Sequence, residues 1–326
     1  MPNHQNEFTE SNQIFLHSSE TMFEIKDNSI RLIITSPPYF NVKDYGMDAQ
    51  IGRSSETYEH YIESMLPVWK ECYRILKPNG KLCINTPIMP MEKKNYSTHY
   101  NRDILNINND VEQSILKDTS FYRYGNIIWD KGSTDQLMMG SYPYPPNFYL
   151  LNTIEYINIF VKDGQPEKIS KELKEKSRLS KEEWREYIST IWKFAPERNR
   201  DHPAPFPVEM PLRLLKMYSF VDDIIVDPFM GSGTTAVAAV IGNRKYLGYD
   251  INPHYVEMAK YRVRELNQGK LFIQNNFGKK PDYELLQILK NLLKEKYFNE
   301  DELMNNMRAG NSIEDILKLI YTKNKP

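Results

Sequence analysis

Short apolar runs recur along the first 250 residues, and each of them ends at a turn or strand-breaking signal. Their spacing predicts strands at residues 13–17, 30–34, 81–85, 126–129, 155–161, 223–226 and 245–250. Between the second and third runs, apolar residues from Ser54 to Leu76 recur at helical spacing, and the Lys77-Pro78-Asn79-Gly80 cluster is expected to end that helix. This alternation predicts an α/β fold with a mostly parallel sheet and right-handed crossovers.

The chain after Asn267 leaves this pattern. Leucines and isoleucines there form two helical stripes, Leu285, Leu286, Ile288, Leu289, Leu292 and Leu293 in the first and Ile313, Ile316, Leu317 and Ile320 in the second. We therefore predict a catalytic domain over residues 1–269 and a small helical appendage over residues 270–326. The appendage either packs on the main domain, which we prefer, or forms a dimer or DNA-contacting module.

Length and composition fit one large domain with an appendage. The 326 residues are 40% apolar, enough for a substantial core, and the net charge is −1, so any nucleic-acid surface must be local. The two cysteines, Cys72 and Cys83, argue against a disulfide framework or a cysteine zinc site, and we expect no metal. No signal segment is found before Glu10 and no apolar stretch approaches the ~20 residues of a membrane span, so we expect a soluble, cytoplasmic protein.

The strand at residues 30–34 ends in the sequence Thr35-Ser36-Pro37-Pro38-Tyr39, or TSPPY. Its Pro-Pro pair has no N–H to donate, so it cannot continue a sheet ladder and must begin a rigid loop. In an open α/β sheet, the edge at which such a loop emerges is where ligands bind. Taken alone, the motif is better explained as a strand-ending turn with a buried tyrosine.

A second loop, Asp227-Pro228-Phe229-Met230-Gly231-Ser232-Gly233-Thr234-Thr235, directly follows the strand at 223–226. Its glycines let the backbone approach a ligand closely, but the lysine of a phosphate-binding loop is missing after the last glycine. Nineteen residues past Gly231, the strand at 245–250 ends in Asp250, at about the spacing at which Rossmann-like folds bind ribose hydroxyls. Asp250 can also cap the helix expected from Pro253, and both roles are compatible.

Together the two motifs resemble those of the β-class amino-methyltransferases of DNA, the N4-cytosine and N6-adenine enzymes of restriction–modification systems, over roughly residues 12–265. The resemblance implies a Rossmann-like, S-adenosylmethionine-dependent methyltransferase fold with helices on both sheet faces. It also implies a circularly permuted motif order, with the catalytic loop first, a DNA-recognition insert next and the cofactor loop last.

The resemblance assigns S-adenosylmethionine as the cofactor. The residues that would hold it are Thr35, Asp227, Pro228, Phe229, Gly231, Ser232, Gly233, Thr234 and Asp250, together with Pro205, Phe206 and Pro207 of an upstream proline-rich motif. This chain departs from the family pattern at one position, near the adenine ring of the cofactor. The family often has an acidic residue after the first strand, where this chain has His17-Ser18-Ser19.

The resemblance makes Ser36, Pro37, Pro38 and Tyr39 the catalytic loop. An exocyclic amino group is a poor nucleophile because its lone pair is delocalised into the ring. The Ser36 hydroxyl and the Pro37 carbonyl can accept its hydrogens, with the proline pair fixing their placement. Tyr39 can stack on a base flipped out of the duplex.

The residue before Pro-Pro separates the possible reactions. In the family, Asp or Asn there usually accompanies adenine-N6 methylation and Ser accompanies cytosine-N4 methylation. Ser36 therefore predicts N4-methylation of cytosine in double-stranded DNA, with adenine-N6 methylation as the alternative. Methylation at C5 would need a thiolate, and neither Cys72 nor Cys83 lies on a predicted catalytic loop. A non-catalytic DNA-binding protein is a third hypothesis, against which the two complete loops argue.

The DNA contacts are predicted in two segments, residues 131–153 and an insert at about 163–200. Residues 165–200 hold ten Lys/Arg and seven Glu, with Trp184, Tyr187 and Trp192 interleaved, a pattern that fits phosphates and bases but also a solvated helix face. The candidate contacts are Tyr142, Tyr144 and Phe148 for the flipped base and Lys168, Lys171, Arg178, Arg185, Arg198 and Arg200 for phosphates. Other possible partners are a second copy in a homodimer and a cognate restriction endonuclease as a separate chain.

Overall fold

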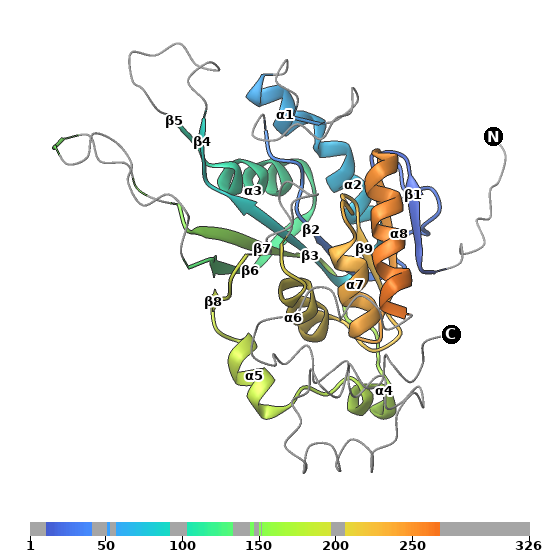
Figure 1. Ribbon diagram of the computed structural model, residues 1–326. Coiled ribbons are helices and arrows are strands. Elements are labelled where there is room, and N and C mark those ends of the chain that lie inside the picture. The colour runs from blue at the N-terminus through green and yellow to red at the C-terminus, as the bar shows by residue number, and fades with distance from the viewer. Residues whose placement is uncertain are drawn as a thin grey trace, which may run out of the picture.

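A computed structural model shows a twisted sheet flanked by helices (Figure 1). It describes residues 11–40, 51–52, 57–91, 103–132, 144–146, 150, 152–196 and 206–267. Within these ranges the main sheet has eight strands in the order β1-β10-β9-β2-β3-β7-β6-β8. They are β1 (Gln13–Leu16), β2 (Ile30–Thr35), β3 (Leu76–Pro87), β6 (Phe121–Asp130), β7 (Ile154–Lys162), β8 (Ile191–Lys193), β9 (Ile224–Asp227) and β10 (Lys245–Asp250).

The five strands β1, β10, β9, β2 and β3 run parallel to one another. β7 is antiparallel to β3 and to β6, so β6 and its parallel neighbour β8 point the same way as the five. The ends of β2, β3, β6, β9 and β10 and the start of β7 therefore lie at one edge of the sheet, which we call the carboxyl edge. The predicted mostly parallel α/β sheet is confirmed.

The helices are α1 (Tyr58–Ser64), α2 (Leu66–Ile75), α3 (Ile107–Asp118), α4 (Lys171–Lys176), α5 (Lys181–Tyr187), α6 (Glu209–Tyr218), α7 (Thr234–Ile241) and α8 (Pro253–Asn267). Two short strands, β4 (Met89–Met91) and β5 (Asp103–Leu105), form a separate sheet. The single helix expected from Ser54 to Leu76 is two helices. Pro67 lies in the first turn of α2, where its missing N–H leaves no hydrogen bond unmade.

The helix ends at Ile75, just before residues 77–80, as predicted, but the predicted start of the strand at Lys81 is wrong. β3 already begins at Leu76, which pairs with Ile30 of β2, and the strand continues through the Pro-Asn-Gly cluster. Asn79 has a φ of 63°, and the register shifts between Ile30 and Leu32. The cluster therefore forms an irregularity within the strand, because pairing with β2 outweighs the local turn preference.

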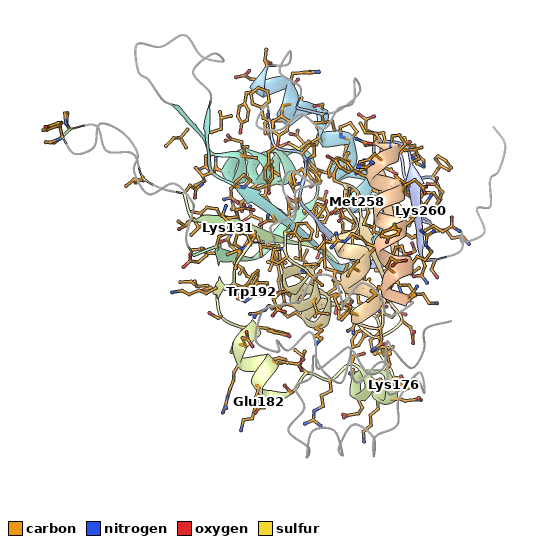
Figure 2. All side chains as sticks on the ribbon, viewed as in Figure 1. Lys131, Lys176, Glu182, Trp192, Met258 and Lys260 are labelled. Atoms are coloured by element: carbon orange, nitrogen blue, oxygen red, sulfur yellow. The ribbon has the colours of Figure 1, made fainter. Side chains whose placement is uncertain are left out.

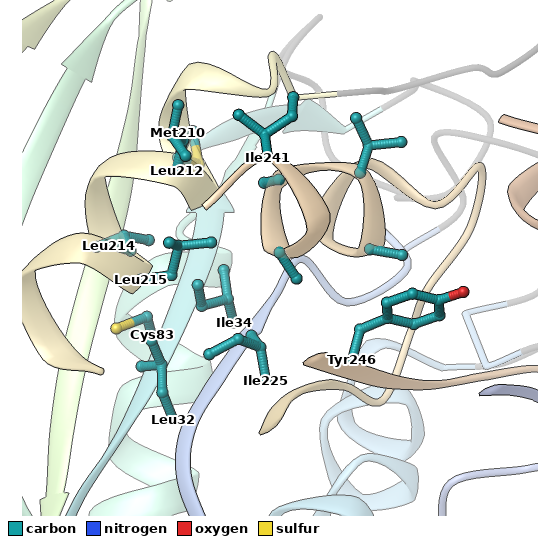
Figure 3. Packing of buried hydrophobic residues seen from close by; sticks show 14 of the residues in the cluster. Leu32, Ile34, Cys83, Met210, Leu212, Leu214, Leu215, Ile225, Ile241 and Tyr246 are labelled. Carbon is teal, nitrogen blue, oxygen red and sulfur yellow. The ribbon is translucent and has the colours of Figure 1, made fainter. Parts of the chain in front are cut away.

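Side chains of β2 alternate between two cores. Leu32 and Ile34 pack with residues of α6 and α7 such as Leu215 (Figure 3), whereas Ile33 packs in a second cluster with Trp69 of α2. This period of two is that of a strand buried on both faces. The expectation of helices on both sheet faces is confirmed.

Two expectations lie outside the described residues. They are the polar N-terminus before Glu10 and the helical appendage at residues 270–326, because the described residues begin at 11 and end at 267. Among the helices that the structure describes, none is both long and apolar enough to cross a bilayer.

Candidate active site

The two sequence motifs meet at the carboxyl edge. β2 and β9 are neighbours in the sheet, with Leu32 opposite Ile225 and Ile33 opposite Val226. The residues that follow the two strands therefore lie together, although 192 positions separate Thr35 from Asp227 in the sequence.

Asp227 joins the two loops. Its side chain is 1% exposed and accepts hydrogen bonds from Thr35 Oγ1 at 2.7 Å, Thr235 Oγ1 at 2.6 Å and the Phe229 N–H at 3.0 Å. Burial raises the pKa of Asp227 to about 6, although these hydrogen bonds act in the opposite direction. The Thr35 hydroxyl, predicted to bind the cofactor, is buried and committed to this bond.

The glycine loop bends tightly between β9 and α7. Gly231 and Gly233 have φ values of +52° and +85°, which side chains rarely allow. A Cβ on Gly233 would lie 2.6 Å from Ala259 Cβ, so glycine lets α8 pack against the loop. The Gly231 N–H donates a 2.8 Å hydrogen bond to Asp250 Oδ2, which ties the loop to the end of β10.

Arg262 of α8 holds the same loop from the other side. Its buried Nη1 donates to the Ser232 carbonyl and hydroxyl, both at 3.0 Å, and to Thr234 Oγ1 at 3.1 Å. Ser232 and Thr234 were predicted to bind the cofactor, and the structure shows their side chains bonded to this arginine. Sequence reasoning missed Arg262, although its spacing from Ala259 and Leu266 places it on the buried face of α8.

Asp250 shapes the turn after β10. Besides the Gly231 N–H, its carboxylate accepts the Asn252 N–H at 2.8 Å, and burial raises its pKa. The capping role that the sequence offered for Asp250 belongs to Asn252, whose Oδ1 accepts the His254 N–H at the start of α8. A ribose contact by Asp250 stays a prediction.

The charges at this edge fit a cationic ligand. Asp227 and Asp250 both have pKa values raised by burial, and neither forms an ion pair with any described residue. Burying the carboxylate of Asp227 and partly burying that of Asp250 without a counter-charge is costly. A positively charged ligand such as a sulfonium or an ammonium group would offset that cost.

The other predicted cofactor residues lie beside the glycine loop in sequence or just before α6. The structure describes Pro228, Phe229, Phe206 and Pro207, and Pro205 lies outside the described residues. Phe229 lies edge-on to Trp69, with ring centroids 6.1 Å apart. Phe206 packs against the core cluster that contains α6, and the Pro207 carbonyl accepts the Met210 N–H at the start of that helix.

The predicted catalytic loop, TSPPY, contains a network of hydroxyl groups. Ser36 Oγ donates to the Asn85 carbonyl at 3.1 Å and lies 2.8 Å from Tyr39 Oη. Tyr39 Oη in turn lies 3.3 Å from Glu155 Oε2 and from Asn85 Nδ2. The phenol has a single hydrogen, so it donates either to Ser36 or to Glu155.

The network extends to β6 and β7. Asn85 Nδ2 donates to Glu155 Oε2 at 2.6 Å, and Lys131 Nζ lies 2.9 Å from Glu155 Oε1. Sequence reasoning missed Asn85, Glu155 and Lys131. Asn85 could have been predicted as a site residue, because it is a polar residue at the end of a predicted apolar strand. Glu155 could not, because it reaches the site only through the pairing of β7 with β3.

Tyr39 is too buried in this structure to stack on a flipped base. Its side chain is 6% exposed, and the loop is further held by a 2.8 Å hydrogen bond from Tyr61 Oη to the Pro38 carbonyl. Stacking of Tyr39 on a base therefore requires that the ring first be uncovered. The stacking role stays a prediction.

The two cysteines cannot supply a nucleophile at this site. Cys72 and Cys83 are buried in α2 and β3, and burial raises the pKa of both thiols. A thiolate, which methylation at C5 of cytosine needs, is disfavoured at both positions.

The predicted DNA contacts are only partly described. Tyr144 is 73% exposed, and Lys168, Lys171, Arg178 and Arg185 are exposed as well. Tyr142, Phe148, Arg198 and Arg200 lie outside the described residues. These assignments stay predictions.

The segment that carries α4 contacts the edge of the sheet opposite the carboxyl edge, which we call the amino edge. Glu167 accepts hydrogen bonds from Lys77 at 2.8 Å and from Arg31 at 3.1 Å, near the amino ends of β3 and β2. Figure 2 shows Lys176 of α4 at the lower end of the molecule, and Lys131 higher, beside β6 and β7. Lys168, Lys171 and Arg178 belong to this segment and so lie across the sheet from the catalytic loop.

The interleaved aromatic residues of the insert are partly structural. Tyr187 and Trp192 are buried, and Arg213 of α6 lies over both rings at 5.2 and 5.3 Å from their centroids. The expectation that these aromatic residues contact bases is therefore wrong for these two, because β8 and α5 pack them into the core. Trp184, 60% exposed, remains available.

Comparisons with known proteins agree with this geometry. The family profile described as DNA methylase, which covers N6 and N4 methyltransferases, matches residues 30–261. The Type II methyltransferase M.MjaI of Methanocaldococcus jannaschii is 31% identical over 277 residues, 76% of this chain and 89% of that protein. M.MthZI of Methanothermobacter thermautotrophicus, also a Type II methyltransferase, is 29% identical over 78% of this chain and 77% of its own length.

Solved structures share the fold. TTHA0409 of Thermus thermophilus, a candidate DNA modification methylase solved in complex with S-adenosyl-L-methionine, matches with a TM-score of 0.65 and 30% identity, over 78% of this chain and 94% of that one. The PvuII cytosine-N4-specific DNA methyltransferase matches in fold, with a TM-score of 0.59 at 19% identity over 88% of this chain and 94% of that one. The chain therefore belongs to the N6/N4 DNA methylase family, whose members are S-adenosylmethionine-dependent amino-methyltransferases of DNA.

Proposed function

We propose that this protein transfers a methyl group to the exocyclic N4 of cytosine at a specific site in double-stranded DNA, as the modification part of a restriction–modification system. The observation that carries the proposal is the Ser36 hydroxyl. It donates to the Asn85 carbonyl, so a lone pair of its oxygen stays available to accept an amino hydrogen.

The site has parts that match this reaction. S-adenosylmethionine supplies an electrophilic methyl group on a sulfonium centre. The buried carboxylate of Asp227 and the half-buried carboxylate of Asp250 favour a cation at the glycine loop, and the Thr35–Asp227 bond holds that loop against Ser36. The Ser36 hydroxyl and the Pro37 carbonyl accept amino hydrogens and so favour a nitrogen lone pair directed out of the ring.

The DNA substrate requires base flipping. The amino group of a paired cytosine lies within the duplex, so the base must leave the stack before it can reach Ser36. We assign Tyr39, Tyr142, Tyr144 and Phe148 to contacts with the flipped base and the basic residues of the insert to phosphates. The Type II description of M.MjaI and M.MthZI supports a modification role beside a separate endonuclease.

The test is methyl transfer to unmethylated duplex DNA from S-adenosylmethionine carrying a labelled methyl group, followed by nucleoside mass spectrometry. Labelled N4-methylcytosine is the expected product. N6-methyladenine as the only product would contradict the choice of base and leave the family assignment intact. Absence of transfer to any duplex would contradict the enzymatic proposal.

A further inference from the structure

One atom of the network around Ser36 has no partner. Asn85 is 3% exposed at the end of β3, and among the described residues its Oδ1 has no hydrogen-bond partner. Its Nδ2, in contrast, donates to Glu155 and to Tyr39. An unpaired buried amide oxygen is destabilising, and such atoms in native structures call for a specific reason.

Glu155 sets the orientation of this amide. A carboxylate accepts hydrogen bonds and donates none, so it must face Nδ2 of Asn85. Rotating the amide by half a turn would place Oδ1 against Glu155 Oε2, where the two oxygens would repel each other. The unpaired Oδ1 is therefore held on the side away from Glu155.

The sheet register explains why these residues meet. β7 lies between β3 and β6, with Glu155 opposite Pro87 on one side and Trp129 on the other. Glu155 thus reaches Asn85 two residues before Pro87 and Lys131 two residues after Trp129. Lys131 occupies Oε1 at 2.9 Å and leaves Oε2 for Asn85 and Tyr39.

Building on the proposed function, we propose that Glu155 is a positioning residue that presents Asn85 Oδ1 as a hydrogen-bond acceptor for the amino group of the target base. An amino group carries two hydrogens, and Ser36 Oγ and the Pro37 carbonyl are the acceptors already assigned to it. Because both hydrogens then have an acceptor, Asn85 Oδ1 takes part as the second acceptor of a bifurcated hydrogen bond and shares one hydrogen with Ser36 Oγ. The two neutral side chains, Ser36 and Asn85, then recognise the amino group without a formal charge beside it.

Three single variants separate positioning from simple packing. Glu155→Gln keeps the size of the side chain but introduces an N–H, so the Asn85 amide is free to turn and Oδ1 is lost as an acceptor. Asn85→Ala removes the acceptor itself. Lys131→Gln breaks the ion pair with Glu155 but leaves Glu155 Oε2 to face Asn85.

The measurement is single-turnover methyl transfer to the cognate duplex, with S-adenosylmethionine affinity and thermal unfolding as controls for folding. Glu155→Gln and Asn85→Ala should each lower the methyl-transfer rate by about tenfold or more, the effect of losing one hydrogen bond of about 1.4 kcal/mol. Cofactor affinity should be unchanged. Lys131→Gln should lose clearly less than Glu155→Gln.

The double variant Glu155→Gln/Asn85→Ala gives the sharpest comparison. If Glu155 acts through Asn85, the double variant should be no slower than the slower single variant, whereas independent roles would multiply the two losses. Multiplied losses, equal losses for Lys131→Gln and Glu155→Gln, or an unchanged rate for Glu155→Gln would overturn the proposal. Should Glu155→Gln fail to fold, a folded Asn85→Ala variant with the unaltered rate would overturn it as well.

The unsubstituted protein separates this inference from the proposed function. Its product identifies the base, so methylation of adenine alone would contradict the N4 proposal while the positioning of an amino group by Asn85 would still be tested by the same rates. Absence of methyl transfer by the unsubstituted protein would contradict both.

Discussion

The Thr35 hydroxyl donates a 2.7 Å hydrogen bond to the Asp227 carboxylate, across 192 positions of sequence. Thr35 is the first residue of TSPPY and Asp227 the first of the glycine loop, so one buried bond fixes the distance between the catalytic and cofactor motifs. Both side chains are buried at the carboxyl ends of adjacent parallel strands. The two motifs to which we assign the methyl acceptor and the methyl donor are therefore positioned by the sheet, which is a rigid support.

The raised pKa of Asp227 predicts a pH-dependent stability. In the folded state the Asp227 carboxyl group keeps its proton up to about pH 6. In the unfolded chain an aspartate loses its proton at about pH 3.9. Between these values the folded state binds more protons, so the free energy of unfolding should fall as pH rises, by at most about 3 kcal/mol in total. Denaturant unfolding at pH 4, 5, 6 and 7 measures this.

Asp227→Asn is the matched control for this pH effect. Its amide does not titrate, and the Thr35 and Thr235 hydroxyls can either donate to it or accept from it. The difference in unfolding free energy between the unsubstituted protein and Asp227→Asn should shrink below pH 5. A difference that is constant from pH 4 to pH 7 would contradict the assigned pKa.

Cofactor binding and chemistry should separate by residue. Asp250→Asn should weaken S-adenosylmethionine binding, because it removes a half-buried negative charge that also accepts the Gly231 N–H. The expected loss of binding free energy is about 1.5–3 kcal/mol, the contribution of one charge-assisted hydrogen bond. Ser36→Ala should leave cofactor affinity nearly intact and abolish turnover. Calorimetry that finds cofactor affinity lost in Ser36→Ala would refute this division of roles.

Arg262 should be essential for the shape of the glycine loop. Arg262→Met keeps much of the buried stem but removes the Nη1 contacts to Ser232 and Thr234, so it should weaken cofactor binding and lower the melting temperature. Arg264→Met, on the exposed face of the same helix, is the control and should change neither. Equal effects of the two substitutions in calorimetry and thermal unfolding would argue against a specific role for Arg262.

The basic residues of the insert should bind DNA phosphates. Replacing Lys168, Lys171, Arg178 and Arg185 together with Gln should weaken binding to all duplexes and reduce the salt slope by about one unit for each phosphate that is no longer neutralised. Cofactor affinity should not change. Lys260→Gln, on the exposed face of α8, is the control for a single charge change.

The position of α4 at the amino edge makes this prediction informative. An unaltered DNA affinity and salt slope in the fourfold variant would assign DNA recognition elsewhere, to residues 131–153 or 270–326. A loss confined to the cognate duplex would contradict phosphate binding as the role of these residues.

The sequence was sufficient for the existence of seven of the eight described strands of the main sheet, all except β8, and for the meeting of the two motifs. β2 and β9 are short apolar runs that end in residues unable to continue a ladder, so their loops had to emerge at a sheet edge. The start of β3 was missed because pairing of Leu76 with Ile30 outweighs the Pro-Asn-Gly signal. Glu155 was missed because its proximity to Ser36 depends on the antiparallel register of β7, which local pattern does not encode.

The burial of Tyr187 and Trp192 shows a second limit. Aromatic residues within a charged segment look alike in sequence whether they face DNA or the core. Only the docking of α5 on α6, through Lys216 and Glu183 at 2.9 Å and the Arg213–Glu186 pair, decides between the two.

Single-molecule sequencing of DNA from a host that expresses this protein tests the central claim most directly, because it reports the modified base and its sequence context together. We predict N4-methylcytosine at one defined sequence in cells with the unsubstituted protein and none in cells with Ser36→Ala. Modification of adenine alone, or a modification pattern that persists in Ser36→Ala, would contradict the account.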